Sequence, residues 1–248
     1  MNELYVKSLE INNLSKSGND SYISNLPIIK NFRCIDFKKP MTFFVGENGV
    51  GKSTLIEAIA LKLGFNPEGG SKNFIFSTNP THSDLHKYLK IIRGSKHPKD
   101  GYFLRSECFY NLATNMDDMD KIDCPLPPIN NAYGGRSLHK QSHGESFLSL
   151  FFNRFLGNGL YILDEPEASL SPQSQMSLLV KFNDLVNLNS QFIVATHSPI
   201  LLSYPLADVY EFTQSSVNLT TYSKTQHYII TKQFLNCPEK MFDILFNV

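Results

Sequence analysis

The sequence predicts an α/β domain built around a mainly parallel sheet. Three short runs are almost entirely apolar, at 41–45, 160–163 and 192–195, and they alternate with segments of helical character. Strands that are buried on both faces of a parallel sheet have this composition, and their alternation with helices favours an α/β architecture. A chain of 248 residues with 42% hydrophobic residues is long enough to bury one such core. We therefore expect a single domain over 1–248.

The first third of the chain predicts three strands and a helix. Residues 4–11 mix apolar and polar side chains, as a strand of an exposed sheet does, and a second strand is expected at 32–37. The apolar run 41–45 then leads into a glycine-rich turn. Residues 53–63 have apolar side chains at helical spacing, and Gly64 is a suitable helix stop.

The middle of the chain is less regular. From 65 to 140, Gly and Pro clusters mark loops around one or two short helices, so we expect an inserted helical and loop subdomain there. A helix is expected over 145–155, and Ser171-Pro172 predicts the start of another. The last forty residues predict strands at 209–212 and 227–230 and a short terminal helix.

Composition excludes several classes of protein. Lys plus Arg and Asp plus Glu both number 23, so no overall field draws the protein to DNA or anionic lipid. The four cysteines form no C-x-x-C pair, which favours free thiols in a reducing compartment. No apolar run reaches the ~18 to 20 residues of a transmembrane helix, and the N-terminus lacks a signal-peptide pattern. We expect a cytoplasmic protein with no integral membrane segment.

The glycine-rich turn after the run 41–45 fits the pattern G-x-x-x-x-G-K-[ST]. Glycines allow successive backbone N–H groups to point at phosphate oxygens, and the following helix start adds partial positive charge. Lys52 is expected to reach the β- and γ-phosphates, and Ser53 to offer its hydroxyl to Mg²⁺. The candidate nucleotide-binding residues are Gly46, Glu47, Asn48, Gly49, Val50, Gly51, Lys52, Ser53 and Thr54.

Two acids, Asp164 and Glu165, follow the apolar run 160–163. Ligands of a parallel sheet bind outside the carboxyl ends of its strands, so the acid pair is expected beside the phosphate loop. Asp164 would then hold Mg²⁺ with Ser53, and Glu165 would polarise the attacking water. His197 follows the next buried run, 33 residues after Asp164 (197 − 164). A neutral histidine there can hydrogen-bond the γ-phosphate or the water.

A fourth motif, Gln141-Ser142-His143-Gly144-Glu145, opens a helix 22 residues before the acid pair (164 − 142). The order and spacing of the four motifs resemble the ATP-binding-cassette family. This resemblance implies a P-loop NTPase fold with an antiparallel N-terminal sheet beside the parallel core. It also implies a site that is shared between two subunits. The residues that would contact ATP in trans are Ser142, His143, Gly144 and Glu145.

Two departures separate the chain from the transporters of that family. Their signature L-S-G-G-Q reads Q-S-H-G-E here, and their glutamine loop corresponds to 101–111, where Glu107 is the nearest candidate and a further candidate Mg²⁺ ligand. The S-x-G-E form and Asn31-Phe32-Arg33 are similar to the RecF-like and chromosome-maintenance ATPases. Nearly the whole chain resembles the small bacterial predicted ATPases, through F-L-R-x-E, S-H-G-E-S-F, L-D-E-P-E and A-T-H-S-P-I-L-L.

The resemblance implies an ATPase that uses ATP and Mg²⁺ as an ATP-driven homodimer, with catalytic roles for Lys52, Glu165 and His197. Ser169, in the loop after the acid pair, is a candidate dimer contact. A carboxylate aimed at the γ-phosphate would be repelled, so we expect Glu145 to order the signature loop or cap its helix.

What the ATPase acts on stays open between three classes of partner. The first is nucleic acid, in repair or defence; the second is a protein partner such as a nuclease or toxin; the third, disfavoured by the signature, is a membrane transporter. Nucleic acid is favoured by the aromatic residues Tyr102 and Phe103 and by one basic stretch, whose alternative role is a solvated face. Its cations are Lys87, Lys90, Arg93, Lys96, Lys99 and Arg105.

The sequence does not decide which residue contacts the adenine base of the nucleotide. Tyr22, Phe32 or Arg33 could stack on adenine, and no residue excludes GTP.

Overall fold

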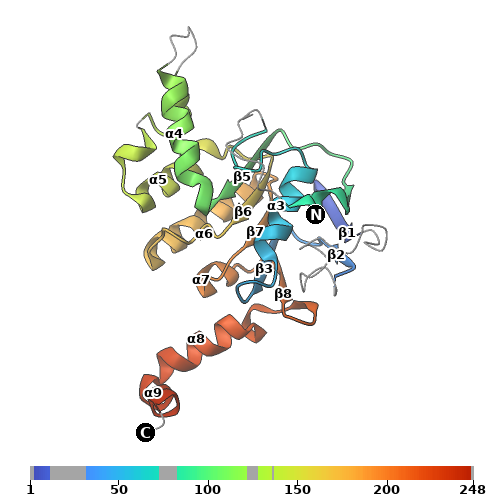
Figure 1. Ribbon diagram of the computed structural model, residues 1–248, viewed down its shortest axis with the longest axis vertical. Coiled ribbons are helices and arrows are strands. Elements are labelled where there is room, and N and C mark those ends of the chain that lie inside the picture. The colour runs from blue at the N-terminus through green and yellow to red at the C-terminus, as the bar shows by residue number, and fades with distance from the viewer. Residues whose placement is uncertain (1–2, 12–31, 73–82, 122–127, 136, 247–248) are drawn as a thin grey trace.

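The computed structural model describes residues 3–11, 32–72, 83–121, 128–135 and 137–246, which form two sheets flanked by helices (Figure 1). The larger sheet has six strands, of which five are parallel and the last is antiparallel to its neighbour. The predicted α/β fold with a mainly parallel core sheet is confirmed. The strand order is β5 (Asp100–Arg105), β6 (Gly159–Asp164), β7 (Gln191–Ala195), β3 (Met41–Gly46), β8 (Ala207–Phe212) and β9 (Val217–Thr220).

The smaller sheet is antiparallel, as the family resemblance implied. Its order is β2 (Cys34–Asp36), β1 (Val6–Ile11) and β4 (Leu89–Arg93). In its central strand, Leu9 is opposite Ile35 on one side and Ile91 on the other. Residues 89–105 therefore depart from the expected helical and loop subdomain, because β4 belongs to this sheet and β5 to the core sheet. The partners of β4 lie about eighty positions away in β1, so no local pattern announced the strand.

Two hydrophobic clusters cover the two faces of the core sheet. In β3, Phe44 belongs to the cluster that contains helix α3 (Lys52–Lys62) and the small sheet, while Phe43 and Val45 belong to the other. All three side chains are fully buried, as expected for an apolar strand inside a parallel sheet. The second cluster is covered by α4 (Phe109–Asp120), α5 (His143–Ser149), α6 (Pro172–Asn187) and α7 (Pro199–Leu202).

The ends of these helices follow the sequence closely. Ser171 caps α6 and Pro172 occupies its first turn, as predicted. The helix expected over 145–155 begins earlier, because Ser142 is its cap, and it continues from α5 into a π-helical turn at Leu150–Arg154.

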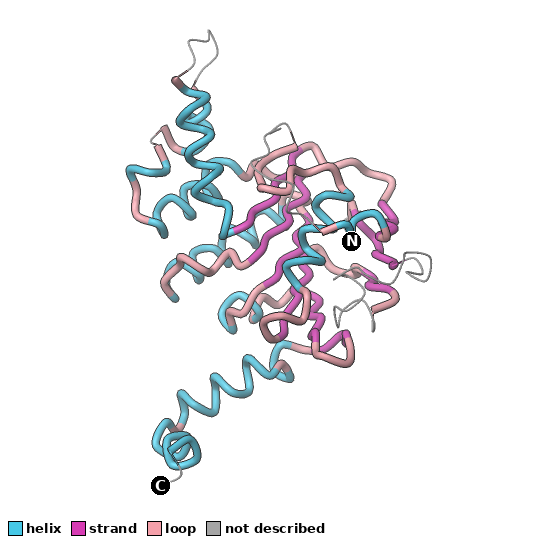
Figure 2. Tube along the Cα trace, in the orientation of Figure 1, coloured by secondary structure: helices cyan, strands magenta, loops and turns pink. Residues whose placement is uncertain are grey.

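The chain ends in two further helices, α8 (Gln226–Asn236) and α9 (Pro238–Phe246). The strand predicted at 227–230 is wrong, since these residues form the first turn of α8. The Thr225 side chain accepts a hydrogen bond from the Tyr228 N–H and so caps this helix. Neither helix has a buried residue, and Figure 2 shows both projecting away from the strands. Among the described residues, no helix combines the length and hydrophobicity that crossing a bilayer requires.

A buried side-chain amide helps to join the two sheets. Gln191 begins β7, and its side chain accepts from the Val6 N–H and donates to the Val6 carbonyl, both at 2.9 Å. Nearby, the Tyr5 hydroxyl donates to the Asn189 carbonyl at 2.9 Å. The Gln191 amide thus satisfies both backbone groups of Val6 away from solvent, which a shorter or apolar side chain would leave unpaired.

Replacing Gln191 by Ala should therefore destabilise the protein. We expect a loss of about 2 to 4 kcal/mol in the free energy of unfolding, because a donor and an acceptor lose their partners inside the protein. Urea denaturation measures it. The exposed Gln173→Ala is the matched control and should change stability by less than about 0.5 kcal/mol. Equal effects of the two substitutions would contradict this role of Gln191.

Candidate functional site

The phosphate loop spans the turn from β3 to α3. Gly46 has φ 150° and Gly51, the N-cap of α3, has φ 101°, and L side chains rarely adopt such backbone angles. At Gly46 a Cβ atom would also lie 2.2 Å from the Phe212 carbonyl oxygen. Glycine at both positions is therefore required by the turn itself. The loop tip, Glu47–Gly49, is exposed.

Lys52 is buried at the start of α3 and folds back over this loop. Its Nζ donates to the Gly46 carbonyl at 2.7 Å and to the Glu47 carbonyl at 2.8 Å. Burial lowers the pKa of Lys52, while Glu165 and Asp164 act in the opposite direction. No carboxylate of the described residues forms a direct ion pair with it. A cation held only by neutral carbonyls can exchange them for anionic phosphate oxygens.

Ser53 and Asp164 meet as the sequence predicted. The Ser53 hydroxyl donates to Oδ1 of Asp164 at 3.2 Å, and this carboxyl group is buried. Burial, followed by the charge of Glu165, raises the pKa of Asp164 to about 7. A hydroxyl and a buried carboxylate that has no ion pair among the described residues are hard oxygen donors that fit Mg²⁺, which commonly takes its other ligands from phosphate and water. The described residues contain no cluster of three or more His, Cys, Asp or Glu side chains suited to a metal.

Glu107, the further candidate for Mg²⁺, is close enough for its charge to raise the pKa of Asp164, but its ion pair is with Arg105. Its carboxylate is largely exposed and pairs with Arg105 at 3.3 Å, and Arg105 in turn pairs with Glu57 at 2.8 Å. Among the described residues, no hydrogen bond or ion pair joins Glu107 to Ser53 or Asp164, so its role as a ligand stays a prediction.

Glu165 has the unusual backbone angle φ 51°. Such a conformation costs on the order of 1 kcal/mol or more and is found preferentially at functional sites. The Glu165 N–H donates to the Ala195 carbonyl at 3.0 Å. On the other side, the Ser106 hydroxyl lies 3.0 Å from the Asp164 carbonyl oxygen and 2.6 Å from that of Glu165. Sequence reasoning missed Ser106, although its place directly after β5 is a signal, because the ends of β5 and β6 are neighbours.

His197 reaches the acid pair from the end of β7. Its Nε2 lies 3.5 Å from Oε1 of Glu165, and its Nδ1 lies 3.0 Å from Nε2 of His227. Burial, Lys52 and His227 lower the pKa of His197 to about 4, so the ring is neutral at pH 7. His227 was not anticipated, because its segment was expected to form a strand.

Glu167 ties the acid-pair turn to the histidine turn. Its Oε1 accepts from the Thr196 hydroxyl at 2.7 Å, the His197 N–H at 2.6 Å and the Ser198 N–H at 3.1 Å. Burial raises the pKa of Glu167. Three donors on one oxygen order the backbone on which His197 is carried, a role that the sequence alone did not reveal.

The signature motif lies apart from the phosphate loop of its own chain (Figure 1). Ser142 and Glu145 form a capping box: the Ser142 N–H donates to Glu145 Oε2 at 3.0 Å and the Glu145 N–H to Ser142 Oγ at 3.4 Å. Glu145 therefore caps its helix, as expected. A Cβ at Gly144 would lie 3.1 Å from the Ser169 carbonyl oxygen, so the candidate dimer contact adjoins the signature. The His143 side chain is outside the described part.

No hydrogen bond or ion pair of the described residues connects residues 142–145 with residues 46–54. Ser142 and Glu145 are exposed, so both remain accessible to another molecule.

Three of the aromatic residues that were expected to stack on bases are buried, so these expectations are wrong. Tyr102 and Phe103 are both fully buried in the core, and therefore cannot stack on nucleic-acid bases. Phe32 is also a core residue and cannot stack on adenine, whereas Arg33 is exposed. Tyr22 and Asn31 lie outside the described residues.

The basic stretch is partly neutralised. Ion pairs join Lys87 to Asp84, Lys90 to Glu10 and Arg105 to Glu57. The other three cations are exposed and form no ion pair with another described residue: Arg93, Lys96 and Lys99.

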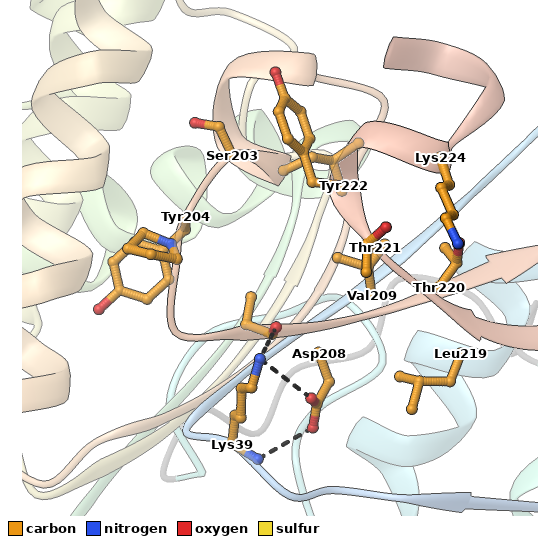
Figure 3. Close-up of a pocket in the computed structure, with 13 residues that line it drawn as sticks. Lys39, Ser203, Tyr204, Asp208, Val209, Leu219, Thr220, Thr221, Tyr222 and Lys224 are labelled. Atoms are coloured by element: carbon orange, nitrogen blue, oxygen red, sulfur yellow. Dashed lines mark hydrogen bonds and ion pairs between the residues drawn. The ribbon is translucent and has the colours of Figure 1, made fainter. Parts of the chain in front are cut away.

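Two cavities lie along β8, one at each end. A cavity of about 550 Å³ lies at the start of β8, where Lys39 donates to the Ala207 carbonyl at 2.8 Å and pairs with Asp208 (Figure 3). It contains no predicted site residue. A cavity of about 300 Å³ lies at the other end, bordered by Gly46, Val50 and His227. This second cavity provides open space beside the phosphate loop.

Two family models match the sequence. An AAA domain model matches residues 22–111, which include the phosphate loop, and an AAA ATPase domain model matches residues 146–202, which include the acid pair and His197. No curated protein matches the sequence significantly.

Solved structures give a more distant likeness. One is cbiO1 from Clostridium perfringens, described as part of the ABC transporter complex cbiONQ, with 16% identity over 99% of this chain and 100% of that chain and a TM-score of 0.49. A putative metal-chelate type ABC transporter has 17% identity over 93% and 88%, with a TM-score of 0.48. An ATP-binding cassette of an ABC transporter has 14% identity over 86% and 90%, with a TM-score of 0.49.

The raised pKa of Asp164 predicts that this side chain destabilises the unliganded protein. Its folded pKa of about 7 lies above the ordinary value of 3.8, so the cost of its charge builds up between these pH values and is complete above pH 7. Without nucleotide or divalent cation, Asp164→Asn should raise the free energy of unfolding at pH 8 by up to about 4 kcal/mol.

Urea denaturation at pH 8 and at pH 4 measures this effect. The gain should nearly vanish at pH 4, where the carboxyl group is largely protonated in the folded chain. The exposed Asp184→Asn serves as the control and should show little change at either pH. An Asp164→Asn protein that is less stable than the parent at pH 8 would contradict the assignment.

Proposed function

We propose that the chain is a small ATPase domain of the ABC/AAA type, which binds ATP with Mg²⁺ and hydrolyses it at a site shared by two copies; the two family-model matches and the sheet topology support this. The observation that carries this proposal is the 3.2 Å contact between Ser53 and Asp164. It brings the phosphate loop and the acid pair, 111 positions apart (164 − 53), to one edge of the sheet.

The phosphate loop and Lys52 hold the phosphates of ATP. The backbone N–H groups at the start of α3 point out of the helix toward an anion, and Lys52 exchanges the Gly46 and Glu47 carbonyls for phosphate oxygens. Ser53 and Asp164 are the residues that would hold Mg²⁺, which neutralises phosphate charge when bound.

Glu165 and His197 act on the attacking water and the γ-phosphate. The partly exposed Glu165 carboxylate accepts a proton of the water, whose oxygen attacks the γ-phosphorus in line while the bond to the ADP oxygen breaks. His197, neutral and 3.5 Å from Glu165, donates a hydrogen bond to the phosphate end of the site. Catalysis then rests on positioning and on charge stabilisation.

The signature motif supports a composite site. Ser142 and Glu145 are exposed, and no hydrogen bond or ion pair among the described residues joins them to the phosphate loop of their own chain. A second copy placed head to tail would bring them to the ATP of the first, with Ser169 beside Gly144 at the contact. Because ATP would then touch both chains, its binding favours the dimer and hydrolysis releases it. The protein would then act as a slow, ATP-gated clamp in the cytoplasm.

We favour DNA, in repair or defence, as the molecule on which the ATPase acts. The support is the sequence resemblance to RecF-like ATPases and the exposed cations Arg93, Lys96 and Lys99, whereas the buried Tyr102 and Phe103 give none. A nuclease or toxin partner is the alternative, and a pull-down from the native host would reveal it. Co-purification with an integral membrane protein would instead point to a transporter subunit.

Glu165→Gln should trap the dimer. The amide cannot accept the proton of water, so ATP stays bound and keeps contacting both chains. We expect a loss of at least about a hundredfold in hydrolysis and, by analytical ultracentrifugation, a long-lived dimer only with Mg-ATP. A variant that remains monomeric while binding ATP would overturn the shared site.

Mixing two inactive variants tests the sharing directly. Lys52→Ala disables ATP binding within a chain, and Ser142→Arg blocks the surface offered to the second chain. Each alone should be inactive, whereas a mixed dimer contains one intact site. Recovery of up to about a quarter of the parent activity is expected, since half of the dimers are mixed and each has one working site of two. If both variants are folded and their mixture recovers no activity, the shared site is contradicted.

The three exposed cations should mediate DNA binding. Labelled duplex and single strands are titrated with the parent protein at several salt concentrations. Replacing Arg93, Lys96 and Lys99 by Gln should weaken binding and reduce the slope of log affinity against log salt by about 2 to 3. The matched control replaces three cations already paired with carboxylates: Lys87, Lys90 and Lys121. Equal losses in both triple variants, or no binding by the parent, would exclude this load.

A further inference from the structure

His197 is not the only histidine at the site. Its Nδ1 lies 3.0 Å from Nε2 of His227, which belongs to the first turn of α8, thirty positions later (227 − 197). The two ring centroids are 5.1 Å apart. Within the described residues, the other two ring nitrogens, His197 Nε2 and His227 Nδ1, are buried without a hydrogen-bond partner.

One proton must be shared between the two facing nitrogens. Burial and the Lys52 cation lower the pKa of both rings, so both are neutral near pH 7. A neutral imidazole has one N–H and one lone pair. A hydrogen bond at 3.0 Å therefore has two arrangements, in which either His227 or His197 is the donor.

Glu165 distinguishes between these arrangements. If His197 donated from Nδ1, its Nε2 would present a lone pair to a carboxylate oxygen only 3.5 Å away, which is repulsive. If His227 donates instead, His197 keeps its proton on Nε2, where an N–H faces the negative oxygen. His227 Nδ1 is then an unpaired acceptor, which costs less than a lone pair held against a carboxylate.

The first turn of α8 is the anchored part of that helix. Thr225, fully buried, donates to the Tyr222 carbonyl at 2.8 Å and caps the helix. The Gln226 N–H donates to Glu211 at 2.8 Å, and the Tyr222 and Tyr228 rings lie 4.5 Å apart. The His227 ring is thus held in place although the rest of α8 has no buried residue.

We propose that His227 is a positioning residue, which fixes His197 as the Nε2–H tautomer so that its N–H faces the Glu165 carboxylate. The assignment of the tautomer stands on the geometry of three side chains. Its consequence for hydrolysis rests on the proposed function. A phosphate oxygen has only lone pairs to offer, so His197 must be a donor to bind it, and His227 supplies the constraint that keeps it one.

The tautomer can be read in the unliganded protein. Long-range proton–nitrogen correlation spectra of protein with ¹⁵N-labelled histidine separate protonated from unprotonated ring nitrogens, and comparison with His197→Gln assigns the signals among the seven histidines. We expect an unprotonated Nδ1 and a protonated Nε2 for His197. Protonation of His197 at Nδ1 would overturn the proposal without any variant of His227.

Two substitutions of His227 then test the mechanism. His227→Gln keeps an N–H within reach of His197, whereas His227→Leu removes the donor. We expect His227→Leu to show both tautomers of His197 and to lose about tenfold to a hundredfold in kcat, with KM for ATP changed by less than about twofold. His227→Gln should restore most of kcat and the single tautomer. Unchanged His197 signals in His227→Leu, or equal losses in both variants, would overturn it.

The tautomer spectra and the hydrolysis assay test the role of His227 and the proposed function separately. If the parent protein binds ATP but does not hydrolyse it, the proposed function fails while the spectra still decide the tautomer. If the parent hydrolyses ATP and His197 has its proton on Nδ1, only the role of His227 fails. Melting temperatures of both variants show whether each is folded.

Discussion

The parallel pairing of β7 between β3 and β6 is the constraint on which the site depends. Val194 is aligned with Phe43 on one side and with Leu163 on the other, so the three strands end at one edge. At that edge one strand continues into the phosphate loop, one into the acid pair and one into the histidine turn. If β7 slipped by one residue against either neighbour, each of its side chains would move to the opposite face of the sheet. All residues of β7 are buried, so the packing on both faces would be lost. Core packing therefore enforces the alignment of the site.

Several charged side chains of the described residues lie close together at this edge of the sheet without forming direct ion pairs with Lys52. Lys52 lies among three carboxylates, Glu165, Asp164 and Glu167, but pairs directly with none of them among the described residues. The buried Asp164 raises the energy of the unliganded fold, and the backbone of Glu165 adds strain. Proteins retain such features where a ligand relieves them. The same groups that weaken the empty protein are those that can gain from a triphosphate and its cation.

Much of this architecture could be predicted from local patterns. The phosphate loop, the acid pair and His197 each follow an apolar strand, and the capping box of Ser142 and Glu145 is written within four residues. What could not be predicted depends on distant partners. β4 is short and charged at two of its five positions, and its pairing with β1 is invisible locally. The Ile229-Ile230 pair favours a strand by its β-branched side chains, but the Thr225 cap and the contacts of the first turn select a helix. Glu167, Ser106 and His227 acquire their roles only when separate strand ends meet.

The terminal helices have a thermodynamic consequence of their own. Helices of 11 and 9 residues are marginal in water without tertiary packing, and α8 and α9 expose Leu235, Ile244 and Leu245 instead of burying them. Beyond the anchored first turn of α8, they form a unit whose opening costs little and does not require the body to unfold. Amide hydrogens in this unit will exchange far faster than those of β3 or β7. The chain thus divides into a body with high local stability and a terminal segment whose helicity depends on its surroundings.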